Sequence, residues 1–187
     1  MNPSSSNLTH KRVLGVAIPI VLANATIPIL GAVDTGVVGQ MGLAAPIGAV
    51  GIGAIIISAI YWLFGFLRMG TTGLTAQAIG SNDHSETSAL LVRGILIGIV
   101  AGLTLILIQI PLFSTALGLA PASQEVEGLA NEYLKIRVFS APAAIAIFGI
   151  TGWLIANERT RAVLVLMLLI NSINIVLDFV FVLRLGW

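Results

Sequence analysis

Two carboxylates in this sequence lie inside long stretches of uncharged residues. Asp34 directly follows the neutral stretch Val13–Val33, and Asp178 interrupts the otherwise neutral stretch Ala162–Leu183. A carboxylate removed from water is costly, so it usually faces a protein interior or a water-filled cavity. Burial and a neighbouring acid both favour the neutral, protonated form of a carboxyl group. The two acids are therefore candidates for a site that binds and releases an ion.

Amide side chains accompany both acids. Asn171, Asn174 and Asp178 follow the spacing i, i+3, i+7, which places them on one face of a helix. Asn24 and Asp34 form a similar polar stripe on the first neutral stretch. These oxygens predict a proton site, or a Na⁺ site built from carboxylate and amide oxygens. The alternative is that each acid is a structural hydrogen-bond partner near a helix end.

One cation also lies within an apolar stretch. Arg68 has two possible roles: it pairs with one of the acids, as Arg184 could, or it extends toward the inner membrane surface. Polar or small residues share its helical face: Ser58, Tyr61, Gly65, Thr72 and Thr75. Both roles remain open at this stage.

The composition explains what must position these residues. Hydrophobic residues make up 57% of the 187 residues, only 9% are charged, and the mean hydropathy is +1.04. Soluble domains carry about 25% charged residues. The composition therefore excludes a soluble enzyme, and the net charge of +1 provides no patch for nucleic acid. The chain has no Cys and two His, too few for a thiolate or His-based metal site or a catalytic triad, so neither an enzyme nor a cofactor is expected.

Five neutral stretches reach the roughly 20 residues that a membrane-spanning helix needs. We therefore predict an all-α, polytopic transmembrane bundle, preceded by a cytoplasmic tail over 1–12. The predicted helices, which together form one unit over 13–187, cover about 13–38, 46–79, 90–117, 130–156 and 162–185. The second is long enough to contain a break, for which Gly70–Gly73 is the candidate.

The distribution of Lys and Arg predicts a cytoplasmic N-terminus. With that orientation five basic residues lie at inner ends: Lys11, Arg12, Arg93, Arg159 and Arg161. Three lie at outer ends: Lys135, Arg137 and Arg184. Asp34 and Asp178 then both fall late in helices that run outward, which predicts that they lie at similar depth.

Small residues and prolines predict how the helices pack. Gly94, Gly98 and Gly102 recur every four residues and form a smooth face on which another helix can pack closely. Pro19 and Pro28 lie within the first predicted helix, and each favours a kink there.

Three motifs resemble those of the multidrug and toxic compound extrusion (MATE) family. They are VDTGVVGQMG (Val33–Gly42), LRMGTTGLTAQAIG (Leu67–Gly80) and NxxNIVLDFVF (Asn171–Phe181). The second is similar to its DNA-damage-inducible (DinF) branch. The resemblance implies twelve helices in two six-helix lobes, so the chain corresponds to about five helices of an N-terminal lobe and lacks the C-terminal lobe.

The resemblance also implies a function and its residues. Family members export organic cations and other amphipathic compounds in exchange for H⁺ or Na⁺. Their helix-one acid corresponds to Asp34, and their helix-five Asn and Asp correspond to Asn174 and Asp178. We therefore expect an efflux antiporter lobe in a bacterial inner membrane, in contact with lipid. The alternatives are a flippase for lipid-linked substrates and a non-transporting membrane assembly subunit.

Overall fold

The computed structural model describes residues 9–40, 44–120 and 122–180, and in this part every element is a helix. The side chains of Asp34, Thr35 and Val38 lie outside the description. The α-helices are α1 (His10–Gly39), α2 (Ala44–Trp62), α3 (Gly65–Gly80), α4 (His84–Leu107), α5 (Gln109–Leu119), α6 (Gln124–Arg137), α7 (Ala141–Ala156) and α8 (Thr160–Asp178). A 3₁₀ helix, η1 (Val138–Ser140), joins α6 to α7.

Five segments of the described chain are long and apolar enough to cross a membrane, which confirms the predicted all-α bundle. They are His10–Val33, Ala44–Gly80, His84–Leu107, Gln124–Ala156 and Thr160–Asp178. α1 starts three residues before the predicted helix and continues through Pro19 and Pro28. The division into a tail over 1–12 and a lobe over 13–187 stays a prediction.

Three of the five predicted helices are discontinuous. The segment predicted at 46–79 is broken at Leu63 and Phe64, so the proposed break at Gly70–Gly73 is wrong. The reason is packing: the Thr72 hydroxyl, between those glycines, donates to the Gly152 carbonyl at 3.1 Å and fixes this turn of α3 against α7. The segment predicted at 90–117 is broken at Ile108.

The fourth predicted helix, at 130–156, also differs from the observed one. It begins six residues earlier, at Gln124, because the Ser123 side chain accepts a hydrogen bond from the Val126 amide and caps the helix. It then breaks at η1, directly before Pro142 in the first turn of α7. The fifth helix begins at Thr160 rather than 162, and the predicted end at 185 lies outside the described residues.

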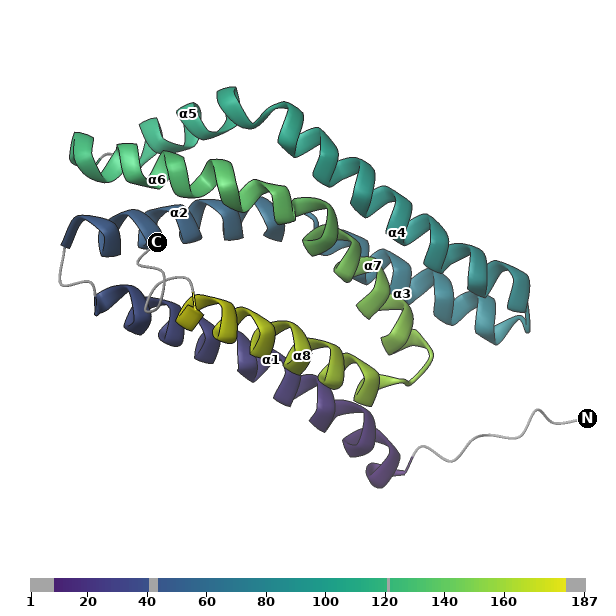
Figure 1. Cartoon of the computed structure of the whole chain (residues 1–187). Coiled ribbons are helices and arrows are strands. Elements are labelled where there is room, and N and C mark those ends of the chain that lie inside the picture. Colours follow the sequence, from purple (N-terminus) through teal and green to yellow (C-terminus); the bar gives the residue numbers. More distant parts are fainter. Residues whose placement is uncertain (1–8, 41–43, 121, 181–187) are drawn as a thin grey trace, which may run out of the picture.

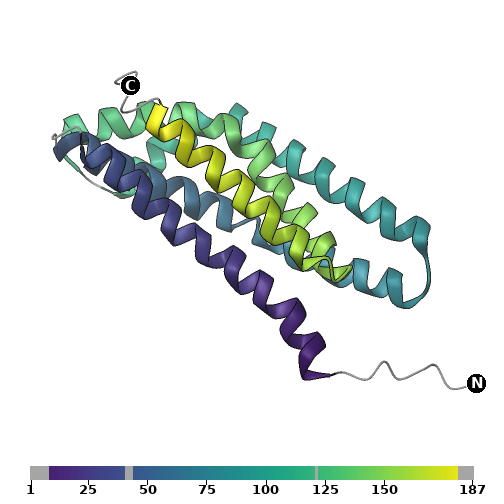
Figure 2. The ribbon, with the colours of Figure 1, turned by 60° about the horizontal axis from the view of Figure 1, so that its bottom comes forward.

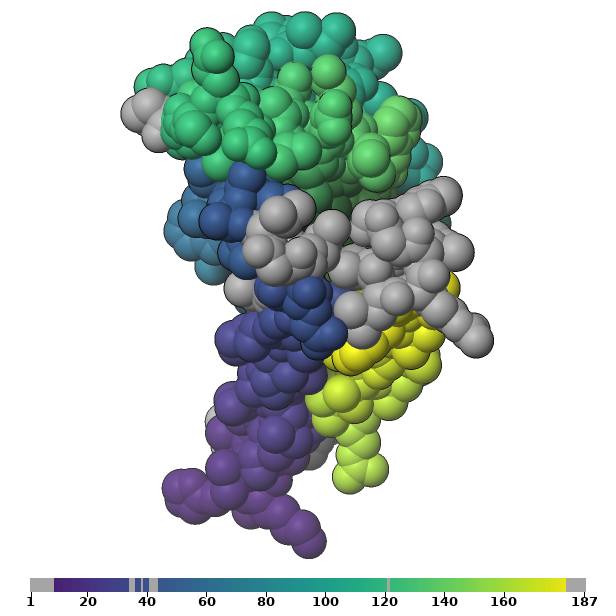
Figure 3. Space-filling model, turned by 60° about the vertical axis from the view of Figure 1, so that its left-hand side comes forward, coloured from purple at the N-terminus to yellow at the C-terminus, as the bar shows by residue number. Residues whose placement is uncertain are grey.

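The helices form two groups. α2 to α7 pack into one body, here called the α2–α7 body, whereas α1 and α8 lie side by side as a separate layer, the α1–α8 pair (Figures 1 and 2). Figure 3 shows the pair, in purple and yellow, below the blue and green helices of the body. The pair therefore lies along the body as a unit.

The tightest interface of the body joins α4 to α7. Gly94, Gly98 and Gly102 are all buried, as predicted from their spacing, and they face the backbone of α7. A Cβ atom added at Gly98 would lie 2.5 Å from the Ala146 Cα, and one at Gly102 would overlap Pro142. No larger residue fits at these contacts, so close backbone approach requires glycine.

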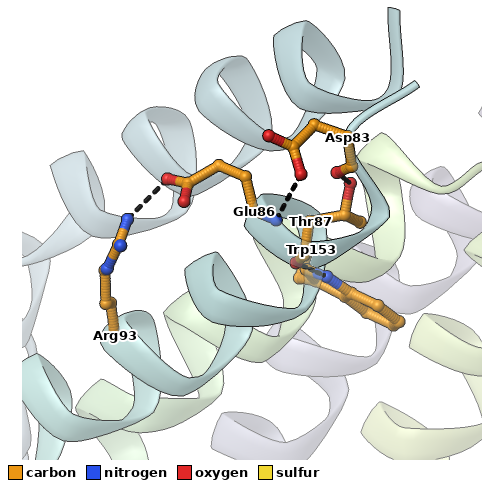
Figure 4. Close-up of polar contacts among 5 residues, drawn as sticks. All are labelled: Asp83, Glu86, Thr87, Arg93 and Trp153. Atoms are coloured by element: carbon orange, nitrogen blue, oxygen red, sulfur yellow. Dashed lines mark hydrogen bonds and ion pairs between the residues drawn. The ribbon is translucent and has the colours of Figure 1, made fainter. Parts of the chain in front are cut away.

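Polar contacts fix the turn between α3 and α4 and attach it to α7 (Figure 4). The Asp83 carboxylate caps α4 by accepting a hydrogen bond from the Glu86 amide at 2.9 Å. The Trp153 indole nitrogen donates to the Thr87 carbonyl at 2.8 Å, which joins α7 to the first turn of α4. Glu86 also forms an ion pair with Arg93, which lies seven residues later on α4. This end of the body is thus held by several independent contacts.

Candidate functional site

The α1–α8 pair carries both predicted coupling acids, and two polar contacts set its register. Arg12 near the start of α1 pairs with Glu158, in the turn before α8, with an N–O distance of 2.6 Å. Further along, the Asn171 amide donates to the Thr26 hydroxyl at 2.6 Å. The contacts are 14 residues apart on α1 and 13 apart on the segment containing α8. The two helices therefore run parallel, nearly residue for residue.

This register brings the acids to one level. Asp34 comes eight residues after Thr26, and Asp178 comes seven residues after Asn171. At a rise of about 1.5 Å per residue, both backbones lie about 10–12 Å beyond the Thr26–Asn171 contact. The side chain of Asp34 lies outside the described residues. The similar depth of the two acids stays a prediction, and the register of the two backbones is consistent with it.

Asp178 is the last residue of α8, and its carboxylate oxygen Oδ2 is buried. Seven residues correspond to nearly two full turns, so Asp178 shares a helix face with Asn171, whose side chain contacts α1. Asn174 is half-buried on the intervening turn. The predicted face of α8 is therefore the one directed at α1, and one carboxylate oxygen of its acid is buried.

On α1 the polar side chain that contacts α8 is not the predicted Asn24. The side chain of Asn24 is exposed and forms no hydrogen bond with the described residues, so it does not join the interface. Thr26 takes that place. The sequence feature that could have identified Thr26 is the small residue Ala23, which is only 2% exposed and marks the packed face of α1. Thr26 follows Ala23 by three residues and shares this face, whereas Asn24 lies about 100° away around the helix.

Arg68 lines a separate cavity of about 590 Å³ between the α1–α8 pair and the α2–α7 body. The predicted stripe divides here, since Ser58, Tyr61 and Gly65 also line the cavity, whereas Thr75 is fully buried in the body. The full lining is Ile27, Ser58, Tyr61, Trp62, Gly65, Phe66, Arg68, Met69 and Phe148. Of the two roles open for Arg68, pairing with an acid is not observed among the described side chains.

These features define a class of protein. A helical membrane bundle with an acid in each of two parallel spans, beside a cavity at a discontinuous helix, has the architecture of a secondary transporter lobe. The MatE family model matches residues 19–180, and the chain belongs to this family of transporters, which are not enzymes.

Similar proteins agree with this assignment. The chain is 38% identical over 170 residues to the DNA damage-inducible protein F of Escherichia coli K12, covering 91% of this chain and 37% of that protein. It is 23% identical over 168 residues to the multidrug export protein MepA of Staphylococcus aureus, covering 90% of this chain and again 37% of the relative. The chain thus spans well under half the length of these relatives.

Solved structures show the same fold. A MOP superfamily transporter from Pyrococcus furiosus superposes with a TM-score of 0.85 at 22% identity, over 95% of this chain and 39% of that one. A multidrug resistance MATE transporter in an outward-facing conformation gives 0.83 at 24% identity, over 95% and 39%. The described helices therefore form a multi-pass membrane unit with the fold of part of these transporters.

Proposed function

We propose that this chain forms the ion-coupling lobe of an efflux antiporter that exchanges amphipathic or cationic compounds for H⁺ or Na⁺. The observation that supports the proposal is the parallel register of the α1–α8 pair, from which we infer that Asp34 and Asp178 lie at similar depth. Its membership of the MatE family supports the same function. The complete transporter needs a second lobe, because alternating access requires two units that move against each other.

The coupling step follows from the chemistry of the paired acids. Two carboxyl groups at one depth in a poorly hydrated site repel each other when both are ionised, so one of them readily takes up a proton or they share a cation. Binding removes charge from the interface between α1 and α8 and lets α1 bend near Pro28. Ion and substrate then compete through one conformational equilibrium, as exchange requires.

Replacing Asp178 by Asn tests this step. Asp178→Asn keeps the shape of the side chain and removes its charge, so the protein should fold and lose gradient-driven export. Asp34→Asn should act in the same way, and Asn174→Ala should have a weaker effect. The measurement is ethidium efflux from everted vesicles under imposed pH or Na⁺ gradients, using the protein at its full natural length and at matched expression.

Glu132→Gln provides the matched control, because it makes the same chemical change at an exposed position on α6. It should leave export unchanged. If the Asp34→Asn/Asp178→Asn double variant retains wild-type coupling, the proposed mechanism is wrong, and both acids have a structural role. Comparison of the two gradients distinguishes H⁺ from Na⁺ as the coupling ion.

The proposed orientation in a bacterial inner membrane places the N-terminus in the cytoplasm. The start of α1, the α3–α4 turn and the α7–α8 turn lie at one end of the bundle (Figure 1), and that end is proposed to face inward. Ser85→Cys tests this, because Ser85 is exposed in the α3–α4 region and the native chain contains no Cys. A membrane-impermeant thiol reagent should label it only in opened cells. Labelling in intact cells would show that the orientation is the opposite of the proposed one.

A further inference from the structure

The cavity lined by Arg68 lies where the second membrane span is broken. α2 ends at Trp62, α3 begins at Gly65, and residues from both ends line the cavity. At the break the Phe64 amide donates to the Tyr61 carbonyl at 2.9 Å, a tighter pattern than that of an α-helix. Irregular backbone at membrane depth is tolerated where it is buried in protein or lines a polar cavity. The location therefore favours a site rather than a packing defect.

Among the described residues, the positive charge of Arg68 has no acidic partner in the cavity. Of the described side chains that line it, Arg68 is the one cation, and none is Asp or Glu. Both ion pairs of the described residues join other side chains, Arg12 with Glu158 and Arg93 with Glu86. A guanidinium within an apolar region is costly when it is unpaired. An anion that entered the cavity would supply the missing partner through charge-assisted hydrogen bonds.

The other side chains that line the cavity are suited to bind the apolar part of a ligand. Aromatic side chains from three helices line the same cavity as Arg68: Trp62 from α2, Phe66 from α3 and Phe148 from α7. The volume of about 590 Å³ lies within the range of small-molecule sites. The Ser58 hydroxyl adds a polar group on the same wall.

We infer that the cavity at the α2–α3 break binds an amphipathic anion, whose acidic group pairs with Arg68 and whose apolar body lies among the aromatic side chains. As a statement about substrates the inference rests on the proposed export function, and it adds amphipathic anions to the compounds proposed there. The anion has two possible sources, a free amphipathic acid and the headgroup of an anionic lipid. Binding can be measured without export, so the two proposals can fail separately.

A matched pair of fluorescent probes tests the charge preference. Dansylglycine carries a carboxylate and dansylcadaverine an ammonium group on the same fluorophore. Trp62 lines the cavity, and a background in which Trp153, Trp187 and any further tryptophan of the full-length protein are replaced by Phe leaves Trp62 to transfer excitation energy to the dansyl group. In nanodiscs of neutral phosphatidylcholine, dansylglycine should quench Trp62 saturably and bind more tightly than dansylcadaverine.

Three variants locate the site. Arg68→Gln should weaken dansylglycine binding about tenfold, the expected effect of losing a charged hydrogen-bond partner, and Arg68→Lys should weaken it less. Arg93→Gln, an exposed arginine outside the cavity, is the control and should have no effect. Gly65→Leu should weaken both probes, because a Cβ atom there meets nothing within 4 Å and its side chain enters open space.

The outcomes separate the explanations. Equal dansylglycine affinity for wild type and a normally melting Arg68→Gln variant would overturn the inference, as would tighter binding of dansylcadaverine to the wild type. Loss of this preference with intact gradient-driven export would leave the proposed function standing, whereas retained binding without export would overturn the proposed function alone. Adding phosphatidylglycerol to the nanodiscs distinguishes the sources: competition with dansylglycine identifies a lipid headgroup, and its absence a free acid.

Discussion

The α4–α7 interface and the α1–α8 pair are held together in different ways. α4 and α7 each bury six residues, among them glycines whose backbones touch. α8 buries two residues, Thr160 and Val163, and its contact with α1 uses polar side chains at Thr26–Asn171. The first interface brings helix backbones into contact at glycines. The second is also extensive, and polar side chains contribute to it.

The difference indicates which part of the lobe can move. Touching backbones cannot slide or separate without losing many contacts at once, so the α2–α7 body should behave as a rigid unit. Side-chain hydrogen bonds can break and re-form at small displacements. Within the described chain α1 and α8 contact each other extensively and the α2–α7 body little, so we expect the pair to move relative to the body as a unit.

Gly98→Leu should have the largest effect on this comparison. The added side chain meets the α7 backbone, where the nearest Ala146 atoms lie 2.5 Å from a Cβ position. We expect a loss of more than about 3 kcal/mol of stability, since backbone must move, measured by thermal melting in detergent. Gly73→Leu is the matched control, because nothing lies within 4 Å of its Cβ position. Equal melting of the two variants would contradict the rigid interface.

Asn171→Ala should have a smaller effect on stability and a clear effect on function. It removes the donor to the Thr26 hydroxyl, a part-buried hydrogen bond worth about 1 kcal/mol. The register of α1 and α8 should loosen, so gradient-driven export should fall while the fold persists. Asn24→Ala, an exposed asparagine on α1, should change neither quantity. An identical loss of export in both variants would show that the contact does not set the register.

Tyr61→Phe removes a single hydrogen bond within the α2–α7 body, so we expect a small effect on stability. The hydroxyl groups of Tyr61, next to the α2–α3 break, and Ser140, in η1, are 3.2 Å apart and join two helix breaks. We expect a loss of about 0.5 kcal/mol, and Ser140→Ala should cost as much. A double-mutant cycle in melting experiments should give non-additive effects. Strict additivity would mean that the two breaks are energetically independent.

Charge changes at Arg12 and Glu158 should have the smallest effect on stability. Both side chains are about half exposed, and exposed ion pairs contribute little to stability. Arg12→Glu and Glu158→Arg should each leave the melting temperature nearly unchanged at moderate salt. A large loss in either variant, recovered in the charge-swapped double variant, would show that the α1–α8 pair is held more firmly at this end than packing indicates.

The sequence predicted the packing of α4 and the polar face of α8 correctly because both depend on local periodicity. The spacing of Gly94, Gly98 and Gly102 places them on one face of a helix, whichever helix packs against them. Asn171 and Asp178 likewise share a face on any regular helix. The break in the second span was misplaced for the converse reason. Gly70 and Gly73 are weak helix formers, but the contact of Thr72 with Gly152 overrides their preference, and no local pattern contains that contact.

Contacts between distant segments also decide which of Asn24 and Thr26 faces α8. Both are polar residues two positions apart on one helix, and which of them faces α8 depends on the rotation of α1 about its axis. That rotation is set by neighbours distant in the sequence, and Asn171 is one of them. The pairing of Arg12 with Glu158, 146 residues away, depends on the same placement.

The sequence by itself determined the membrane class and the five spans, because hydropathy, length and charge are properties of each segment alone; it also suggested Asp34 and Asp178 as candidate coupling acids. The tertiary structure decided where the spans break, which polar residues meet, and that α1 and α8 pair apart from the rest. It also created the cavity around Arg68, whose lining comes from four helices. Such features arise from contacts between segments, and the free energy of those contacts is not contained in any one segment.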